Sequence, residues 1–115
     1  MCLMVPPQAR VRAGEEDPDC RSCGGILKSA TISFGQSLVA EDIERAFAAA
    51  EECDVLLAVG TSLTVQPVSR LVPTAKQAGA AVVILNAEPT PYDGLADAVV
   101  SGSISEVLPR LVARP

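Results

Sequence analysis

Two short segments of this sequence carry residues that could do chemistry. The first is Gly60-Thr61-Ser62, which follows directly on the apolar run Val55 to Val59. In α/β proteins a ligand binds where a buried strand ends, because the sheet opens there into a crevice and the N–H groups of the next helix can meet a phosphate. We therefore predict a ligand-binding turn here. The alternative is that Thr61 and Ser62 simply cap the following helix.

The second segment is Cys20-Arg21-Ser22-Cys23, followed by Gly24 and Gly25. Without a secretory signal this C-x-x-C spacing favours a metal over a disulfide, because the turn can point both thiolates at one tetrahedral zinc ion. A closed zinc site needs four ligands, and the sequence has no histidine. The remaining candidates are Cys2, Cys53 and carboxylates. Cys2 is a candidate third ligand in a site completed by water or a partner chain, whereas Cys53 is interpreted as a packing residue. A C-x-x-C segment without metal is the alternative.

The elements that must position these residues can be read from apolar spacing. Val55 to Val59 lacks polar alternation, which predicts a strand covered on both faces by helices. Ala40 to Glu52 has the i, i+3, i+4, i+7 spacing of an amphipathic helix. Further predicted strands are Ala30 to Phe34, Ala80 to Leu85 and Asp97 to Val100. A second predicted helix runs from Pro67 to Gly79 and is kinked or split by Pro73. A third starts at about Ser105, where Pro109 is tolerated near the first turn, and is expected to bury Val107, Leu108, Leu111 and Val112.

This alternation of strands and helices predicts an α/β fold with a parallel sheet and right-handed crossovers. Composition agrees, because 49% of the 115 residues are hydrophobic but only 3% are aromatic, so Val, Leu, Ile and Ala must build the core. The net charge of −5 and the lack of a basic cluster argue against nucleic acid and anionic membranes as partners. No apolar run suits a membrane span or a signal peptide, so the expected compartment is the cytoplasm.

Several motifs occur in an order that resembles the C-terminal part of a sirtuin. From Cys20 onward they cover nearly the whole sequence, and a set of six ordered motifs is far more specific than a lone Gly-Thr-Ser. They are Cys20-x-x-Cys23-Gly24-Gly25, Leu27-Lys28, Phe34-Gly35, Gly60-Thr61-Ser62-Leu63-x-Val65-x-Pro67, Asn86-x-Glu88-Pro89-Thr90-Pro91 and Glu106-Val107-Leu108.

The resemblance implies an NAD-dependent protein lysine deacylase, in which NAD is consumed as the acyl group passes to ADP-ribose. It implies a Rossmann-like domain and a small zinc module. Residues 1–27 are then the remnant of the zinc module, with Cys20 and Cys23 as metal ligands, and residues 28–115 are the C-terminal half of the Rossmann-like, NAD-binding domain.

The resemblance also implies roles for individual residues. Gly60, Thr61 and Ser62 would contact NAD phosphate and ribose oxygens, and Asn86 would bind the adenosine ribose. Glu88 lies in the same loop, and Ser103 and Ile104 match the place where the family closes over adenine. Ile32, Phe34 and Gly35 would flank the acyl-lysine of a protein or peptide substrate. The alternatives are a turn-forming Asn86, a core Phe34 and a solvated Glu88.

The sequence also departs from the family pattern. It has neither the family's Gly-Ala-Gly-x-Ser phosphate loop nor its catalytic histidine, so no catalytic residue is assigned and the chain is expected to be a truncated sirtuin. A non-catalytic NAD or ADP-ribose binding module, or an inactive remnant, is the alternative. Because half a sheet leaves an edge and apolar faces exposed, self-association or pairing with a separate N-terminal half is expected.

Overall fold

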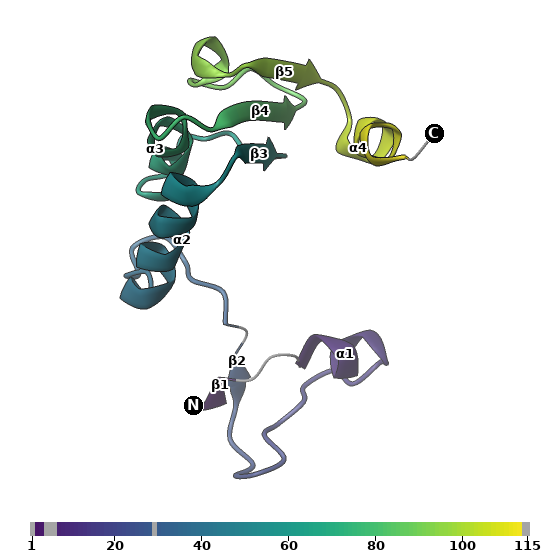
Figure 1. Cartoon of the computed structure of the whole chain (residues 1–115). Helices are drawn as coiled ribbons and strands as arrows, with labels where there is room; N and C mark the ends of the chain where they lie inside the picture. Colours follow the sequence, from purple (N-terminus) through teal and green to yellow (C-terminus); the bar gives the residue numbers. More distant parts are fainter. Residues whose placement is uncertain (1, 4–6, 29, 114–115) are drawn as a thin grey trace. The chain divides into compact units, whose positions relative to one another are not determined.

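The computed structural model describes residues 2–3, 7–28 and 30–113, with side chains from residue 8 to 27 and from 30 to 113 (Figure 1). It divides into two compact units, Met1–Leu38 and Val39–Pro115. The boundary predicted between residues 27 and 28 divides the zinc module from the NAD-binding part, whereas the compact units divide after Leu38. The assignment of these two functional parts stays a prediction. The second unit holds the larger sheet and most of the core.

Three parallel strands form the sheet of the second unit. They are β3 (Val55–Val59), β4 (Ala81–Asn86) and β5 (Ala98–Ser101), in the order β3-β4-β5. The register aligns Val59 with Leu85 and Leu85 with Val100. The predicted parallel α/β arrangement is therefore confirmed, and β3 and β5 are the edge strands among the described residues.

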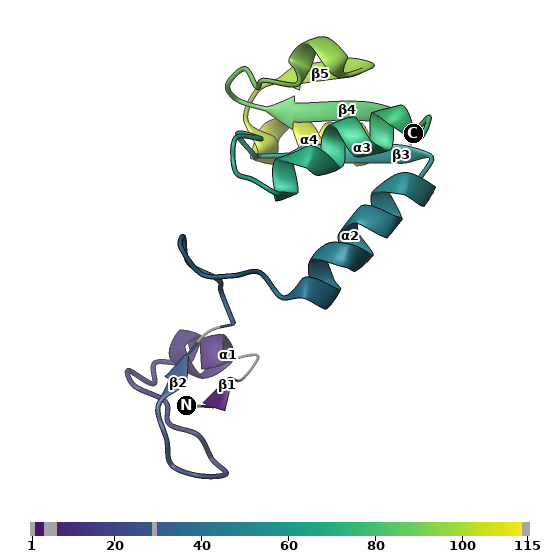
Figure 2. The ribbon, with the colours of Figure 1, turned by 90° about the vertical axis from the view of Figure 1, so that its left-hand side faces the viewer.

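Helices lie on both sides of this sheet. The helix α2 (Ala40–Glu52) carries Glu41 and Asp42 in its first turn, where carboxylates favour the helix dipole. A 3-10 turn (Val68–Arg70) leads into α3 (Leu71–Gln77), and α4 (Ile104–Val112) follows β5. In Figure 2 α3 lies in front of the sheet and α4 lies behind it.

Small aliphatic side chains fill the space between α2, α3 and the sheet. Two clusters do this, and neither contains a buried aromatic residue. One joins Ala58, Leu63, Val72, Val82 and Ile84, and the other joins Ala50, Ala75 and Ala80. Val72, Val82 and Ile84 are at most 2% exposed, so the centre of this side of the sheet is closed to water.

The opposite face of the sheet is only partly covered, which corrects the prediction that helices cover both faces of β3. Side chains alternate along a strand, so Val55 and Leu57 point away from the cluster that holds Ala58. They are 58% and 49% exposed. On α4, Leu111 and Val112 are 53% and 68% exposed, so the prediction that this helix buries its apolar face is wrong for its last turn. The unit therefore exposes apolar surface at the β3 edge.

Three further predictions can be compared with the structure. The prediction of a strand at residues 30–34 is wrong, since these residues form no strand within the described part of the chain and a turn follows at Ser33 to Gln36. The helix predicted from Pro67 to Gly79 is split into the 3-10 turn Val68–Arg70 and α3, and Pro73 lies in the first turn of α3, where a proline removes no helical hydrogen bond. Pro109 lies beyond the first turn of α4, and the helix nevertheless continues to Val112.

The first unit contains short elements of secondary structure. The strands β1 (Cys2–Leu3) and β2 (Leu27–Lys28) pair in parallel, and α1 (Pro7–Arg12) lies between them in sequence. Arg10 on α1 donates through Nε to Glu15 Oε2 at 2.7 Å and through Nη1 to the carbonyl of Asp19 at 2.7 Å. Hydrogen bonding to Arg10 holds the pKa of Glu15 below its ordinary value. Within the described part of the chain, no helix is both long and apolar enough to cross a bilayer.

Candidate functional site

The carboxyl ends of the three parallel strands meet at one edge of the sheet. Gly60 follows β3 and donates its N–H to the carbonyl of Leu85 at 2.9 Å. Gly102 follows β5 and donates to the carbonyl of Asn86 at 3.3 Å. The predicted residues Gly60 and Asn86 are therefore brought to the same edge, which is where α/β folds place ligands.

The turn after β3 has a constrained backbone. Gly60 has φ of 62° and Leu63 has φ of 55°, which is rare for a residue with a branched side chain. Leu63 is only 8% exposed, so packing holds this conformation in place. Constrained backbone of this kind gathers at ligand sites. The sequence alone predicts no role for Leu63, because no pattern of residue types distinguishes it from an ordinary apolar residue.

Thr61 and Ser62 use their hydroxyls inside the turn. Thr61 Oγ1 accepts the N–H of Leu63 at 3.2 Å, and the Ser62 hydroxyl lies 2.8 Å from that of Thr64. The next helical turn starts only at Val68 and has no side-chain cap, so the helix-cap alternative is wrong. Within the described residues the backbone N–H groups of Thr61 and Ser62 donate no hydrogen bond, which leaves them available to an acceptor.

The start of α4 lies over this turn. A Cβ added to Gly60 would overlap Cδ1 of Ile104, so Gly60 and Ile104 are in direct contact. Ser103 precedes α4 and its hydroxyl lies 2.9 Å from that of Ser105. The predicted residues Gly60, Ser103 and Ile104 are thus gathered at one place by the turn after β3 and the start of α4.

The loop after β4 holds the other predicted contacts. The side-chain amide of Asn86 donates from Nδ2 to the carbonyl of Glu88 at 2.9 Å. Asn86 is therefore a turn former, as the alternative proposed, and its Oδ1 atom accepts no hydrogen bond from a described residue. Glu88 is exposed and its carboxylate makes no ion pair with a described residue.

The carboxylate of Asp97 accepts hydrogen bonds at the opposite end of the sheet. Asp97 accepts from Lys76 Nζ at 2.7 Å and from the N–H of Val82 at 2.8 Å. These two hydrogen bonds, from Lys76 first and Val82 second, lower the pKa of Asp97. Asp97 precedes β5 and lies at the amino end, so this network supports the sheet away from the predicted site.

The predicted metal ligands lie in a tight turn of the first unit. The N–H of Cys20 donates to Gly25 at 2.9 Å, and the N–H of Gly24 donates back to Cys20 at 2.7 Å. Cys20 is 5% exposed and Cys23 is exposed. Among the described residues no group of three or more Cys, His, Asp or Glu could hold a metal, so these two thiols alone do not fit a closed zinc site.

The two other cysteines lie in different surroundings. The backbone of Cys2 pairs with that of Leu27, but the position of its side chain lies outside the described residues. Cys53 packs beside the cluster of Ala50, Ala75 and Ala80, and its Sγ lies 3.4 Å from the carbonyl of Ala50. Its interpretation as a packing residue is confirmed.

The predicted substrate residues lie in an exposed loop of the first unit. Phe34 is 91% exposed and Ile32 is 42% exposed, so the alternative of a core Phe34 is wrong. Gly35 has φ of 83° and lies in a turn closed by the side chain of Gln36, which accepts the N–H of Ser33 at 2.9 Å. The structure therefore presents these three residues to solvent.

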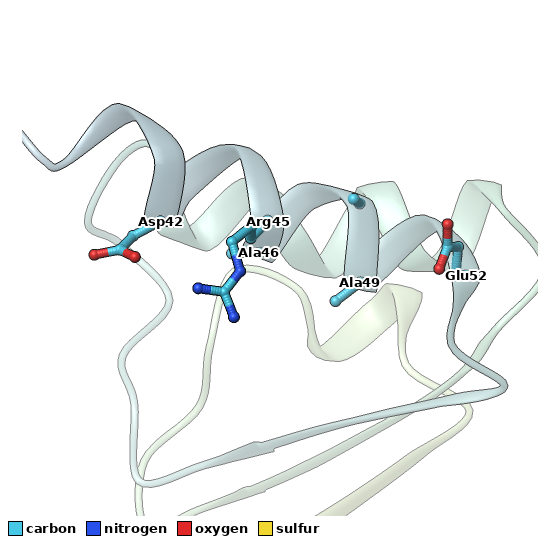
Figure 3. Close-up of a pocket in the computed structure, with 6 residues that line it drawn as sticks. Asp42, Arg45, Ala46, Ala49 and Glu52 are labelled. Carbon is cyan, nitrogen blue, oxygen red and sulfur yellow. The ribbon is translucent and has the colours of Figure 1, made fainter.

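A shallow hollow on the second unit is formed by α2 alone. Figure 3 shows the side chains that line it, with the Arg45 guanidinium on the same side as small alanines. It contains none of the predicted site residues. Its lining residues are Asp42, Arg45, Ala46, Ala48, Ala49 and Glu52.

Comparison with known proteins defines the family. The Sir2 family model matches residues 6–67, which is more than half of the sequence. The chain therefore belongs to the Sir2 family. It is 49% identical over 109 residues to the NAD-dependent protein deacetylase 2 of Streptomyces coelicolor, covering 95% of this chain and 45% of that relative. It is 43% identical over 97 residues to the NAD-dependent protein deacetylase 1 of Pyrobaculum aerophilum, covering 84% of this chain and 38% of that relative.

Solved structures agree with this assignment. A Sir2 enzyme structure superposes with a TM-score of 0.71 at 41% identity, covering 84% of this chain and 40% of the other. A mutant Sir2 homologue in complex with ADP-ribose superposes with a TM-score of 0.72 at 35% identity, covering 84% of this chain and 39% of the other. The chain spans less than half the length of the curated relatives it matches.

Proposed function

We propose that this chain provides one wall of the NAD site of an NAD-dependent protein lysine deacylase. The observation that carries the proposal is the meeting of Gly60, Asn86 and Ile104 at the carboxyl edge of the sheet. Relatives named NAD-dependent deacetylases, and a solved Sir2 homologue with ADP-ribose, support the choice of ligand. NAD would supply the ADP-ribose that accepts the acyl group.

The chemistry of the edge fits a dinucleotide. The N–H groups of Thr61 and Ser62, which donate to no described residue, can donate to phosphate oxygens, and glycine at position 60 keeps side-chain bulk out of the turn. The Oδ1 atom of Asn86, which accepts from no described residue, can accept from a ribose hydroxyl. Glu88 lies in the same loop, while Ser103 and Ile104 would close over the adenine.

Calorimetric titration of the purified chain with ADP-ribose and with NAD tests this proposal. Saturable binding that weakens about tenfold in Asn86→Ala is expected, since this change removes the proposed acceptor of a ribose hydroxyl. Ser62→Ala is also expected to weaken binding, because it removes the hydroxyl that pairs with Thr64 and shapes the turn. Gln77→Ala is the control, because Gln77 is exposed at the end of α3 that lies away from the edge. Absence of binding to folded protein, or equal affinities in all variants, would refute the proposal.

A non-catalytic binding module is the second candidate, and one observation favours it. The sequence contains no histidine, so the general base of the sirtuin reaction has to come from outside this sequence. The purified chain alone is then expected to bind ADP-ribose without removing the acetyl group from an acetyl-lysine peptide. Deacetylation by the chain alone would contradict this assignment.

The roles of the first unit are proposals of the same kind. Ile32, Phe34 and Gly35 would meet an acyl-lysine peptide, and their exposure suits such a contact. A solved Sir2 structure bound to a myristoylated histone peptide, 38% identical to this chain, supports the class of substrate. Cys20 and Cys23 would supply two zinc ligands of a remnant zinc-ribbon module, with the remaining ligands coming from other groups.

A further inference from the structure

Thr90 and the carboxylate of Asp93 form a hydrogen-bonded pair, here called the clasp, in the loop that follows β4. Asp93 Oδ1 accepts the hydroxyl of Thr90 at 2.6 Å, and Asp93 Oδ2 accepts the N–H of Thr90 at 3.1 Å. The Thr90 hydroxyl in turn accepts the N–H of Tyr92 at 3.3 Å. The Asn86 side chain closes the first half of the same loop on Glu88. The loop is therefore two linked turns rather than a free segment.

The loop after β4 and the turn after β3 pack on the same core cluster. Tyr92 lies between the two clasp residues and packs against the core cluster to which Leu63 belongs. Leu63 is the buried residue with positive φ that closes the Gly60-Thr61-Ser62 turn. The Thr90–Asp93 turn holds the backbone of Tyr92 through the hydrogen bond from its N–H to the Thr90 hydroxyl. Two loops that are far apart in sequence thus pack on one core cluster.

We propose that Asp93 is a positioning residue for ADP-ribose binding. Its carboxylate accepts two hydrogen bonds from Thr90, whose hydroxyl accepts the N–H of Tyr92. Through this turn Asp93 fixes Asn86 relative to the turn that carries Thr61 and Ser62. The inference rests on the function proposed above, because it concerns how that site is kept in shape. Asp93 itself touches no ligand in this account, and its effect is transmitted by the loop.

A double-mutant cycle measured by calorimetry with ADP-ribose tests the proposal. The four proteins are the unaltered chain, Asp93→Asn, Asn86→Ala and the double variant. Asp93→Asn removes one acceptor from the clasp without changing its size, and we expect about tenfold weaker binding. In the Asp93→Asn background, Asn86→Ala is expected to cost less than about twofold, because Asn86 is already out of place. Losses that multiply would overturn the proposal.

Matched variants separate positioning from general loss of structure. Asp97→Asn alters a carboxylate that also accepts one backbone N–H and one side-chain donor, but at the opposite end of the sheet. It should leave the affinity within about twofold. Thr90→Ser keeps the hydroxyl and should bind like the unaltered chain, while Thr90→Val should weaken binding as Asp93→Asn does. If Asp93→Asn does not fold, the comparison of Thr90→Ser with Thr90→Val tests the proposal instead. Equal affinities of these two variants for ADP-ribose would overturn the proposal.

The outcomes for this inference and for the proposed function are distinct. If the unaltered folded chain does not bind ADP-ribose, the proposed function fails and the positioning role fails with it. If the unaltered chain binds and both Asp93→Asn and Thr90→Val bind equally well, only the positioning role is refuted.

Discussion

Ile104 of α4 occupies the space into which a side chain at Gly60 would project. This contact places the first turn of α4 directly over the end of β3, although 44 residues separate the two in sequence (104 minus 60). Gly60 also has φ of 62°, which L-residues with a side chain adopt at a cost. Glycine is therefore required here for two independent reasons.

Gly60→Ala is expected to destabilise the chain by about 2 kcal/mol, from backbone strain and displacement of Ile104 together. Urea unfolding followed by circular dichroism measures this. Gly94→Ala is the matched control, because a Cβ at Gly94 meets nothing within 4 Å. It should change stability by less than about 0.5 kcal/mol. Equal stability of the two variants would contradict the account of the turn.

Asp97 makes the stability of the second unit depend on pH. Its pKa is lowered by hydrogen bonds from Lys76 and then from Val82, so the folded state favours the ionised carboxylate. This stabilisation is fully present above the ordinary value of about 4 and is lost as the pH falls through the lower folded pKa. The unaltered chain should exceed Asp97→Asn in stability at pH 7, and the difference should vanish in strong acid. Urea unfolding at a series of pH values measures the difference.

Glu44→Gln serves as the control for the pH series, because Glu44 is exposed beyond the first turn of α2 and makes no ion pair with a described residue. Its stability should follow that of the unaltered chain. A constant difference between Asp97→Asn and the unaltered chain at every pH would show that ionisation of Asp97 contributes nothing.

The exposed apolar side of β3 is expected to drive association. Leu57 is 49% exposed on an edge strand without a charged residue between Val55 and Val59. Leu57→Glu should weaken self-association roughly tenfold in sedimentation experiments, since it places a charge in the contact. Val99→Glu, at a site 43% exposed on the other edge strand, should have little effect. The same decrease in both variants would exclude β3 as the specific contact.

Removal of metal should leave the second unit folded. Cys20 and Cys23 belong to the first unit, and no described residue of the second unit joins them in a metal-binding group. A chelator is therefore expected to shift the melting temperature of the helices by less than about 2 °C, within the effect of a minor change in stability. A larger shift would indicate that metal supports the whole chain.

The regular elements could be predicted because their signals are local. The helix Ala40–Glu52 has the predicted bounds, and so does the strand Val55–Val59, while β4 and β5 are displaced by one residue from the predicted runs. Acidic residues at the helix start, and apolar runs broken by Gly60 and Gly79, identify these elements without knowledge of their neighbours.

The rest depends on contacts that sequence patterns do not contain. A β-prone run such as residues 30–34 forms a strand only if another strand pairs with it, and none does so among the described residues. The apolar sequence of β3 indicates that both of its faces could be buried, but it does not identify the elements that would cover them. The contact of Ile104 with Gly60 and the backbone of Leu63 arise from packing between distant segments.

The two ends of the sheet differ in how firmly their backbone is tied. At the amino end Val82 and Asp97 exchange backbone and side-chain hydrogen bonds, whereas at the carboxyl end Thr61 and Ser62 leave their N–H groups unpaired within the described residues. Local opening should therefore begin at the carboxyl end, and amide hydrogens there should exchange with solvent first. A ligand that pairs those N–H groups would slow that exchange, so binding and local stiffening would be one event.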